Sequence, residues 1–169
     1  MNTQTLPDTG TVDVDSVMMP LSCYTETPEA NQKPFRVLLV DDHATARTLL
    51  RILIEEHPIF EVVGEAADGE EAITLADIYK PEIVLMDIHL PGLSGVDATR
   101  KLHQQWPKTV IVGVSSQYTP HGYNAMIAAG AAAFVCKEDA VGTLLKTIEF
   151  SMRGSRSFRP ASVAPEHLY

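Results

Sequence analysis

The sequence predicts an α/β protein with a doubly wound, five-stranded parallel sheet and helices on both faces of that sheet. Two observations support this fold class. From Phe35 onward, short apolar runs alternate with amphipathic stretches, the pattern of buried parallel strands separated by surface helices. The chain has 169 residues, of which 45% are hydrophobic, and this is enough for one domain with its own core.

The predicted strands are the apolar runs, and an amphipathic stretch lies between each run and the next. A strand that is followed by a helix and then by another strand is expected to lie parallel to it. The strands are Arg36–Val40, Glu61–Ala66, Ile83–Met86, Val110–Val114 and Ala133–Cys136.

The first helix is predicted from apolar residues that recur at i, i+3, i+4, i+7 and i+8, the spacing of one helix face. Arg47, Arg51 and Glu55 fall on the opposite side, and Pro58 is expected to stop the helix. The apolar positions are Ala46, Leu49, Leu50, Leu53 and Ile54.

Capping residues place the second and third helices. Asp68 is a plausible N-cap for a second helix that ends before Pro81. Ser94 and Asp97 have the spacing of a capping box, which predicts a third helix that ends before Pro107.

The last two helices follow the fourth and fifth strands. Thr119-Pro120 is expected to open the fourth helix and Gly130 to close it, with a weakly anchored inner face of alanine and methionine. The fifth starts near Asp139 and breaks at Gly154. Its apolar stripe is Val141, Leu144, Leu145, Ile148 and Met152.

Both ends of the chain are expected to lie outside the folded domain of residues 35–153. Residues 1–34 are rich in Thr, Pro, Asp and Glu without an apolar period, which predicts a disordered leader. Residues 154–169 lack periodicity and are too few for a second domain, so they are interpreted as a tail or linker.

Composition argues against several classes of function. Residues 35–150 carry sixteen acidic and nine basic side chains, so direct binding to nucleic acid is not expected. No apolar run approaches the roughly 18 residues of a membrane span, and a cytoplasmic protein without membrane contact is predicted. Cys23 and Cys136 suggest neither a disulfide framework nor a thiolate metal site.

Polar side chains directly follow four of the predicted strands. Asp41 and Asp42 follow the first strand, Asp87 the third, Ser115 with Ser116 the fourth, and Lys137 the fifth. In a doubly wound sheet, ligands bind outside the carboxyl ends of the strands, where the winding reverses. These side chains are therefore expected to meet in one site.

The residue types at this edge favour phosphoryl chemistry. Three carboxylates repel one another unless a cation lies between them, and an oxygen-only cluster suits Mg²⁺. Lys137 can neutralise an anion, and the hydroxyl of Ser115 can donate a hydrogen bond to it. Asp87, on the third strand, is the best candidate for a carboxylate that takes up a phosphoryl group.

Four sequence blocks resemble the receiver domains of bacterial response regulators over about residues 35–150. They are Val-Asp-Asp-His at 40–43, Leu-Met-Asp-Ile-His-Leu-Pro-Gly at 85–92, Val-Ser-Ser at 114–116 and Ala-Ala-Ala-Phe-Val-Cys-Lys-Glu at 131–138. Within this family, the chain most resembles the receivers of LuxR/FixJ-type regulators. The resemblance implies a flavodoxin-like sheet with strand order 2-1-3-4-5.

The resemblance also implies a role for each site residue. Asp87 would be phosphorylated, Asp42 would bind Mg²⁺ directly, and Asp41 would support the ion. The main-chain carbonyl of His89 would be a further ligand, and Lys137 would pair with the phosphoryl group. Ser115 would hydrogen-bond the phosphoryl group on activation, while Phe134 would be the aromatic switch residue that turns inward.

The partners implied by the resemblance are a sensor histidine kinase or a histidine phosphotransfer protein, a downstream protein target, and a second copy of the chain after phosphorylation. The switching face would consist of the fourth helix, fifth strand and fifth helix. The chain would be a phosphoacceptor in a phosphorelay and no enzyme beyond slow self-dephosphorylation.

Several alternatives remain open on the residues alone. The chain could be the regulatory part of a DNA-binding transcription factor. A haloacid dehalogenase-like phosphatase is a remote alternative, because that family needs a second Asp where this chain has His89. Taken singly, Asp42 could cap the first helix, and Gly92 and Gly95 are expected only to serve turns.

Overall fold

The computed structural model describes residues 33–152, except for the side chain of Val141, and its sheet confirms the predicted fold class. Five parallel strands lie in the order β2-β1-β3-β4-β5. The strands are β1 (Phe35–Val40), β2 (Phe60–Ala66), β3 (Ile83–Asp87), β4 (Val110–Ser115) and β5 (Ala133–Cys136). Each contains one of the five predicted apolar runs, so the strand predictions are confirmed.

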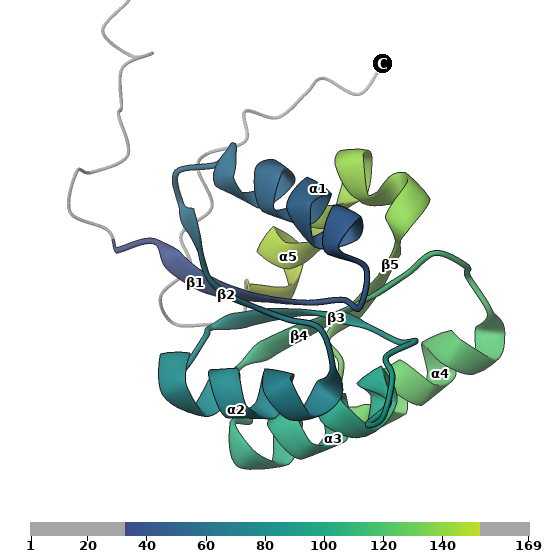
Figure 1. Ribbon diagram of the computed structural model, residues 1–169. Helices are drawn as coiled ribbons and strands as arrows, with labels where there is room; N and C mark the ends of the chain where they lie inside the picture. Colours follow the sequence, from purple (N-terminus) through teal and green to yellow (C-terminus); the bar gives the residue numbers. More distant parts are fainter. Residues whose placement is uncertain (1–32, 153–169) are drawn as a thin grey trace, which may run out of the picture. The chain divides into compact units, whose positions relative to one another are not determined.

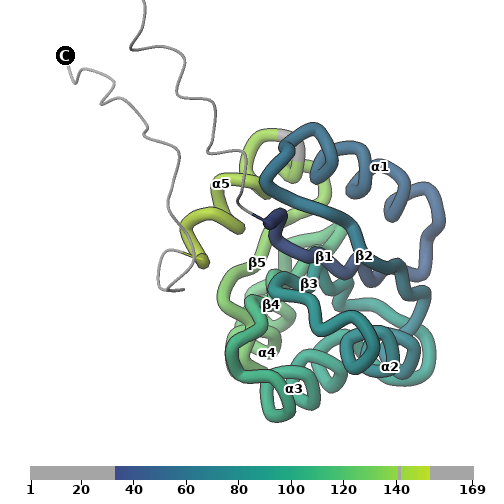
Figure 2. The backbone as a smooth tube through the Cα atoms, turned by 90° about the vertical axis from the view of Figure 1, so that its left-hand side faces the viewer, coloured from purple at the N-terminus to yellow at the C-terminus, as the bar shows by residue number. Residues whose placement is uncertain are grey.

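Helices cover both faces of the sheet. The helices are α1 (Ala44–Glu55), α2 (Gly69–Tyr79), α3 (Gly95–Gln105), α4 (Pro120–Ala129) and α5 (Ala140–Met152), with a short 3₁₀ helix, η3 (Lys137–Asp139), before α5. Figure 1 shows α1 and α5 on one face and α2, α3 and α4 on the other, and the view from the side agrees (Figure 2).

Each face of the sheet has its own apolar core. On one face, Leu50 and Ile54 of α1 pack with Leu144 of α5 against the strands. On the other face, Leu102 of α3 and Met126 of α4 pack against strand residues such as Met86 in a second cluster, where α2 contributes only small buried residues. The strands are thus buried on both sides, which is why they appear as nearly continuous apolar runs in the sequence.

Local capping sets the helix boundaries much as the sequence predicts. The side chain of Asp68 accepts a hydrogen bond from the Glu71 N–H, and Ser94 accepts one from the Asp97 N–H. Thr119 does the same for the N–H of Gly122 at the start of α4. These bonds satisfy amide groups that have no partner within the helix.

The prediction for one residue on the apolar face of α1 is wrong. Leu49 is 59% exposed, whereas Leu50 and Ile54 are buried and Leu53 is half-buried. Successive helix residues differ by about 100°, so a stripe centred on Leu50 and Ile54 leaves Leu49 at the margin of the sheet. Periodicity alone could not fix how far the helix is rotated about its axis.

Parts of the sequence prediction lie outside the described residues. They are the leader apart from Lys33 and Pro34, the tail of residues 154–169 with Gly154, and the side chain of Val141. Within residues 33–152, no helix combines the length and hydropathy that a bilayer crossing requires.

The strand register brings the carboxyl ends of β1, β3, β4 and β5 to one edge of the sheet, which we call the rim. Val40 pairs with Met86, Asp87 with Val114, and Ser115 with Cys136. Asp41 directly follows β1, and Lys137 directly follows β5. The topology therefore gathers residues that are up to 96 positions apart in sequence, from Asp41 to Lys137.

Gly95 packs directly against the rim and does more than serve a turn. It is the first residue of α3, and its N–H donates to the carbonyl of Ile88. A Cβ atom at this position would lie 1.8 Å from the carbonyl oxygen of Asp87. Gly92, in contrast, has a φ of 67°, which suits the turn that was predicted for it.

We expect Gly95→Ala to lower the free energy of unfolding by about 2 kcal/mol, because the added methyl group forces α3 away from the end of β3. Urea denaturation measures the change. Gly142→Ala in α5 is the control, since a Cβ there meets nothing within 4 Å. The control should be slightly more stable than the wild type, and an equally stable Gly95→Ala would contradict the packing described here.

Candidate functional site

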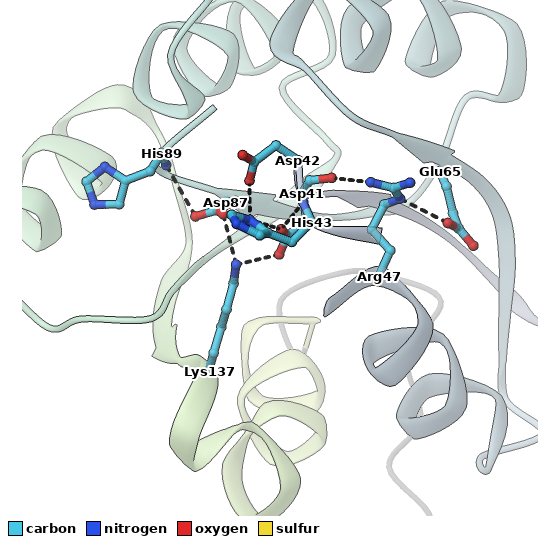
Figure 3. A network of polar contacts seen from close by, with 8 residues as sticks. All are labelled: Asp41, Asp42, His43, Arg47, Glu65, Asp87, His89 and Lys137. Carbon is cyan, nitrogen blue, oxygen red and sulfur yellow. Dashed lines mark hydrogen bonds and ion pairs between the residues drawn. The ribbon is translucent and has the colours of Figure 1, made fainter. Parts of the chain in front are cut away.

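A lysine between two buried carboxylates forms the centre of the rim. Lys137 Nζ lies 2.5 Å from Oδ2 of Asp41 and 2.8 Å from Oδ2 of Asp87 (Figure 3). Asp41 is fully buried and Asp87 is 4% exposed. The three side chains come from the ends of β1, β3 and β5, so the structure brings together three of the residues that the sequence predicted for the site.

The lysine is charged in this environment. Burial lowers the pKa of Lys137, but the contacts with Asp41 and Asp87 raise it by more, and the pKa lies above its ordinary value. The ammonium group thus offsets the mutual repulsion of two carboxylates that have little access to water.

Backbone amides hold one oxygen of each buried carboxylate. Asp41 Oδ1 accepts a hydrogen bond from the His43 N–H at 3.0 Å, and Asp87 Oδ1 accepts one from the His89 N–H at 3.2 Å. Asp41 Oδ2 faces the ammonium group of Lys137 at 2.5 Å and has no other partner among the described residues. This buried oxygen retains capacity for a further positively charged partner.

Asp42 lies beside this centre and is more accessible. Its side chain is 33% exposed, and its Oδ1 lies 2.6 Å from Nδ1 of His43. Ligand atoms of Asp41, Asp42 and His43 lie within 4.8 Å of one another. The alternative role of Asp42 as a helix cap is wrong, because His43 is the N-cap of α1 and no side chain caps that helix.

Ser115 and Phe134 lie on the neighbouring strands. Ser115 is fully buried at the end of β4, and its Oγ accepts a hydrogen bond from the N–H of Gln117 at 3.3 Å. Phe134 is half-buried in β5, and its ring centroid lies 6.1 Å from that of Tyr118 and 6.0 Å from that of Tyr123. Ser115 ends β4 and Phe134 lies within β5, three residues before Lys137, and neither takes part in the lysine–carboxylate contacts.

The sequence analysis missed an ion-pair network behind the rim. Arg47 of α1 donates through Nη1 to the carbonyl of Asp41 at 2.6 Å and through Nε to Glu65 of β2 at 3.1 Å. Arg51, one turn later, also donates to Glu65. Hydrogen bonds from Arg51, and then from Arg47, hold the pKa of Glu65 below its ordinary value. The i, i+4 spacing of two arginines opposite a strand-end glutamate was the available sequence signal.

The donor set at the rim fits a hard divalent cation. Asp41 and Asp42 supply carboxylate oxygens within 4.8 Å of each other, and the buried Asp41 Oδ2 has no partner among the described residues besides Lys137. Oxygen ligands of this kind, few in number, are those that Mg²⁺ prefers in proteins.

The family described as "Response regulator receiver domain" matches residues 37–149, which is more than half of the chain. The chain belongs to this family. Receiver domains take a phosphoryl group on an aspartate and act in two-component signalling, and they are not enzymes in the usual sense. Asp41, Asp87 and Lys137 all lie within the residues that match this family.

Relatives of this receiver domain include regulators of transcription. Nitrate/nitrite response regulator protein NarP of Escherichia coli (strain K12) is 35% identical over 131 residues, which are 78% of this chain and 60% of that protein. Transcriptional regulatory protein DegU of Brevibacillus brevis is 29% identical over 132 residues, which are 78% of this chain and 56% of that protein. The receiver chain thus spans less than two thirds of these relatives.

Solved structures give the same result for the fold. A two-component response regulator of the LuxR family from Aurantimonas is 36% identical with a TM-score of 0.69, covering 76% of this chain and 91% of that one. The response regulator domain of CheB from Thermotoga maritima is 30% identical with a TM-score of 0.66, covering 71% and 97%.

We expect Lys137→Met to lower the free energy of unfolding by about 2 kcal/mol at neutral pH, because two buried carboxylates lose the ammonium group that pairs with both of them. The deficit should shrink at alkaline pH, because the stability that Lys137 contributes in the wild type is lost as the pH rises through its raised pKa. Denaturation at several pH values measures both effects. Lys146→Met, which removes an exposed lysine of α5, is the charge-matched control, and equal stability of the two variants would contradict this account.

Proposed function

We propose that Asp87 is the phosphoacceptor of this receiver domain and that a histidine kinase or a histidine phosphotransfer protein is its donor. The position of Asp87 supports the proposal: it ends the central strand β3, it is 4% exposed, and its Oδ2 contacts Lys137. A carboxylate oxygen attacks phosphorus, the phosphorus–nitrogen bond of phosphohistidine breaks, and the histidine nitrogen leaves with the electron pair and takes up a proton.

The proposed cofactor is Mg²⁺, held by Asp42 and Asp87 with support from Asp41 and with the main-chain carbonyl of His89 as a further ligand. The clustered carboxylate oxygens of Asp41 and Asp42 support this assignment. The ion would supply positive charge against the phosphoryl oxygens, and Lys137 would pair with the same group. The buried Asp41 remains a supporting carboxylate because the His43 N–H already holds its Oδ1.

The proposed switch couples Ser115 and Phe134 to the α4–β5–α5 face. The hydroxyl of Ser115 would turn from the Gln117 N–H to the phosphoryl group, and Phe134 would move inward into the space that it vacates. The buried residues of α4 are Gly122, Met126 and Ala129, so this helix has a small apolar anchor and can shift at low cost. Phosphorylation at the rim would then change the shape of the α4–β5–α5 surface.

Intact-mass measurement after incubation with Mg²⁺ and a small phosphodonor tests the phosphoacceptor. We expect a single adduct with the mass of one phosphoryl group, which hydroxylamine removes because it is an acyl phosphate. Asp87→Asn should form no adduct, since an amide oxygen is a far weaker nucleophile than a carboxylate. Chelation of the metal should prevent the reaction in the wild type.

Asp68→Asn is the control, because this aspartate caps α2 and has no part in the proposed site. It should be modified as the wild type is. An adduct on Asp87→Asn, or an unmodified wild type under donors that modify other receiver domains, would refute the assignment.

A second proposal concerns the output of the domain. The relatives NarP and DegU bear the names of regulators, and this chain covers 60% and 56% of their lengths. We propose that the receiver either acts on a downstream protein, with pairing of two copies after phosphorylation, or regulates an attached DNA-binding module. Reading the gene beyond the codon for Tyr169 distinguishes them, because only the second needs a continuing reading frame.

The acidic surface of residues 35–150 supports the expectation that the receiver itself contacts neither nucleic acid nor a membrane, and that it works in the cytoplasm. The phosphatase alternative has little support, because His89 stands where that class requires an aspartate. Turnover of a small phosphate ester in molar excess over the protein would revive it.

A further inference from the structure

We propose that Arg47 is a positioning residue for the proposed Mg²⁺ site and that it acts by fixing the peptide plane between Asp41 and Asp42. This inference rests on the metal-dependent function proposed above. The hydrogen bonds of Arg47 go to Glu65 and to the main-chain carbonyl of Asp41, so its effect would reach the cation through the backbone.

Arg47 is tied to the backbone between the two rim carboxylates. Arg47 Nη1 donates to the carbonyl oxygen of Asp41 at 2.6 Å, and this carbonyl belongs to the peptide group that joins Asp41 to Asp42. The N–H of Asp41 donates to the carbonyl of Ala66 at 3.1 Å. Because a peptide group is planar, a tie at the carbonyl oxygen also fixes the direction in which the chain enters Asp42.

The side chain of Asp42 has few contacts that could hold it in place. Its side chain is 33% exposed, and within residues 33–152 its carboxylate forms a hydrogen bond only with the exposed side chain of His43. Asp41, in contrast, is buried and contacts both the His43 N–H and Lys137. The placement of the Asp42 carboxylate therefore depends on its backbone more than on its own side-chain contacts.

Arg47 is itself held in place. Its side chain is only 17% exposed, and its Nε is tied to Glu65 of β2 at 3.1 Å (Figure 3). The planar guanidinium group can direct hydrogen bonds to the carbonyl and to the carboxylate at once, whereas the single ammonium of a lysine cannot reproduce both directions. Through Arg47 and Glu65, α1 and β2 together hold the backbone that leads into the proposed metal site.

Electrostatics alone predicts the opposite effect of losing Arg47 on the affinity for Mg²⁺. Arg47 is a cation close to an acidic cluster, so removal of its charge should strengthen the binding of Mg²⁺ if charge were all that mattered. If Arg47 positions Asp42, its loss should weaken binding. The sign of the change separates the two explanations.

The experiment is isothermal titration of the unphosphorylated protein with MgCl₂, for the wild type, Arg47→Lys, Arg47→Met and Arg51→Met. We expect the dissociation constant to rise roughly tenfold in Arg47→Lys, the lower end of the range for groups that orient metal ligands. Arg47→Met should also bind more weakly than the wild type. Arg51→Met is the matched control, because Arg51 also donates to Glu65 from α1 but does not touch Asp41.

Arg51→Met should bind Mg²⁺ as the wild type does or slightly more tightly. Wild-type affinity in Arg47→Lys, or tighter binding in Arg47→Met, would overturn the proposal while leaving the proposed function intact. A wild type that binds no Mg²⁺ would instead refute the metal site and this inference with it.

A metal-free measurement guards against variants that are merely unstable. The His43 N–H donates to Asp41 Oδ1 at 3.0 Å and reports on the order of this segment. Its hydrogen exchange without Mg²⁺ should be faster in Arg47→Lys than in Arg51→Met, while amides in the centre of β3 exchange equally in both. Uniformly faster exchange would show general destabilisation and would count against a positioning role.

Discussion

The ion pairs of Lys137 with Asp41 and Asp87 are the interaction on which the organisation of the rim depends. They connect the ends of β1, β3 and β5, although the three residues are far apart in sequence. Two buried carboxylates at one edge would repel each other in a medium that screens charge poorly. The fold tolerates them because the parallel order of the strands delivers a cation to the same point.

Most of the fold could be predicted because its signals are local. Strand burial on both faces gives unbroken apolar runs, and side chains such as Asp68, Ser94 and Thr119 cap helices within three residues of themselves. The contact between Asp41, Asp87 and Lys137 also follows, because parallel topology places every strand end at one edge. The roles of these residues in phosphoryl transfer remain predictions.

Features that depend on how elements are rotated or packed were not predictable. The exposure of Leu49 follows from the rotation of α1 about its own axis. The contacts of Arg47 with Glu65 and with the Asp41 carbonyl require α1 and β2 to be in their final positions. Periodicity places Arg47 on the polar side of its helix but does not show that this side meets the end of a strand.

The position of the single tryptophan determines how this molecule can be observed. Trp106 caps the carboxyl end of α3, beneath Lys80, whose Nζ lies 5.1 Å from the centre of the indole ring. This end of α3 is opposite the rim, because α3 begins where β3 ends. Tryptophan emission is therefore expected to be insensitive to events confined to the acidic cluster, and a change in that emission would indicate a rearrangement that extends from the rim to the opposite end of the sheet.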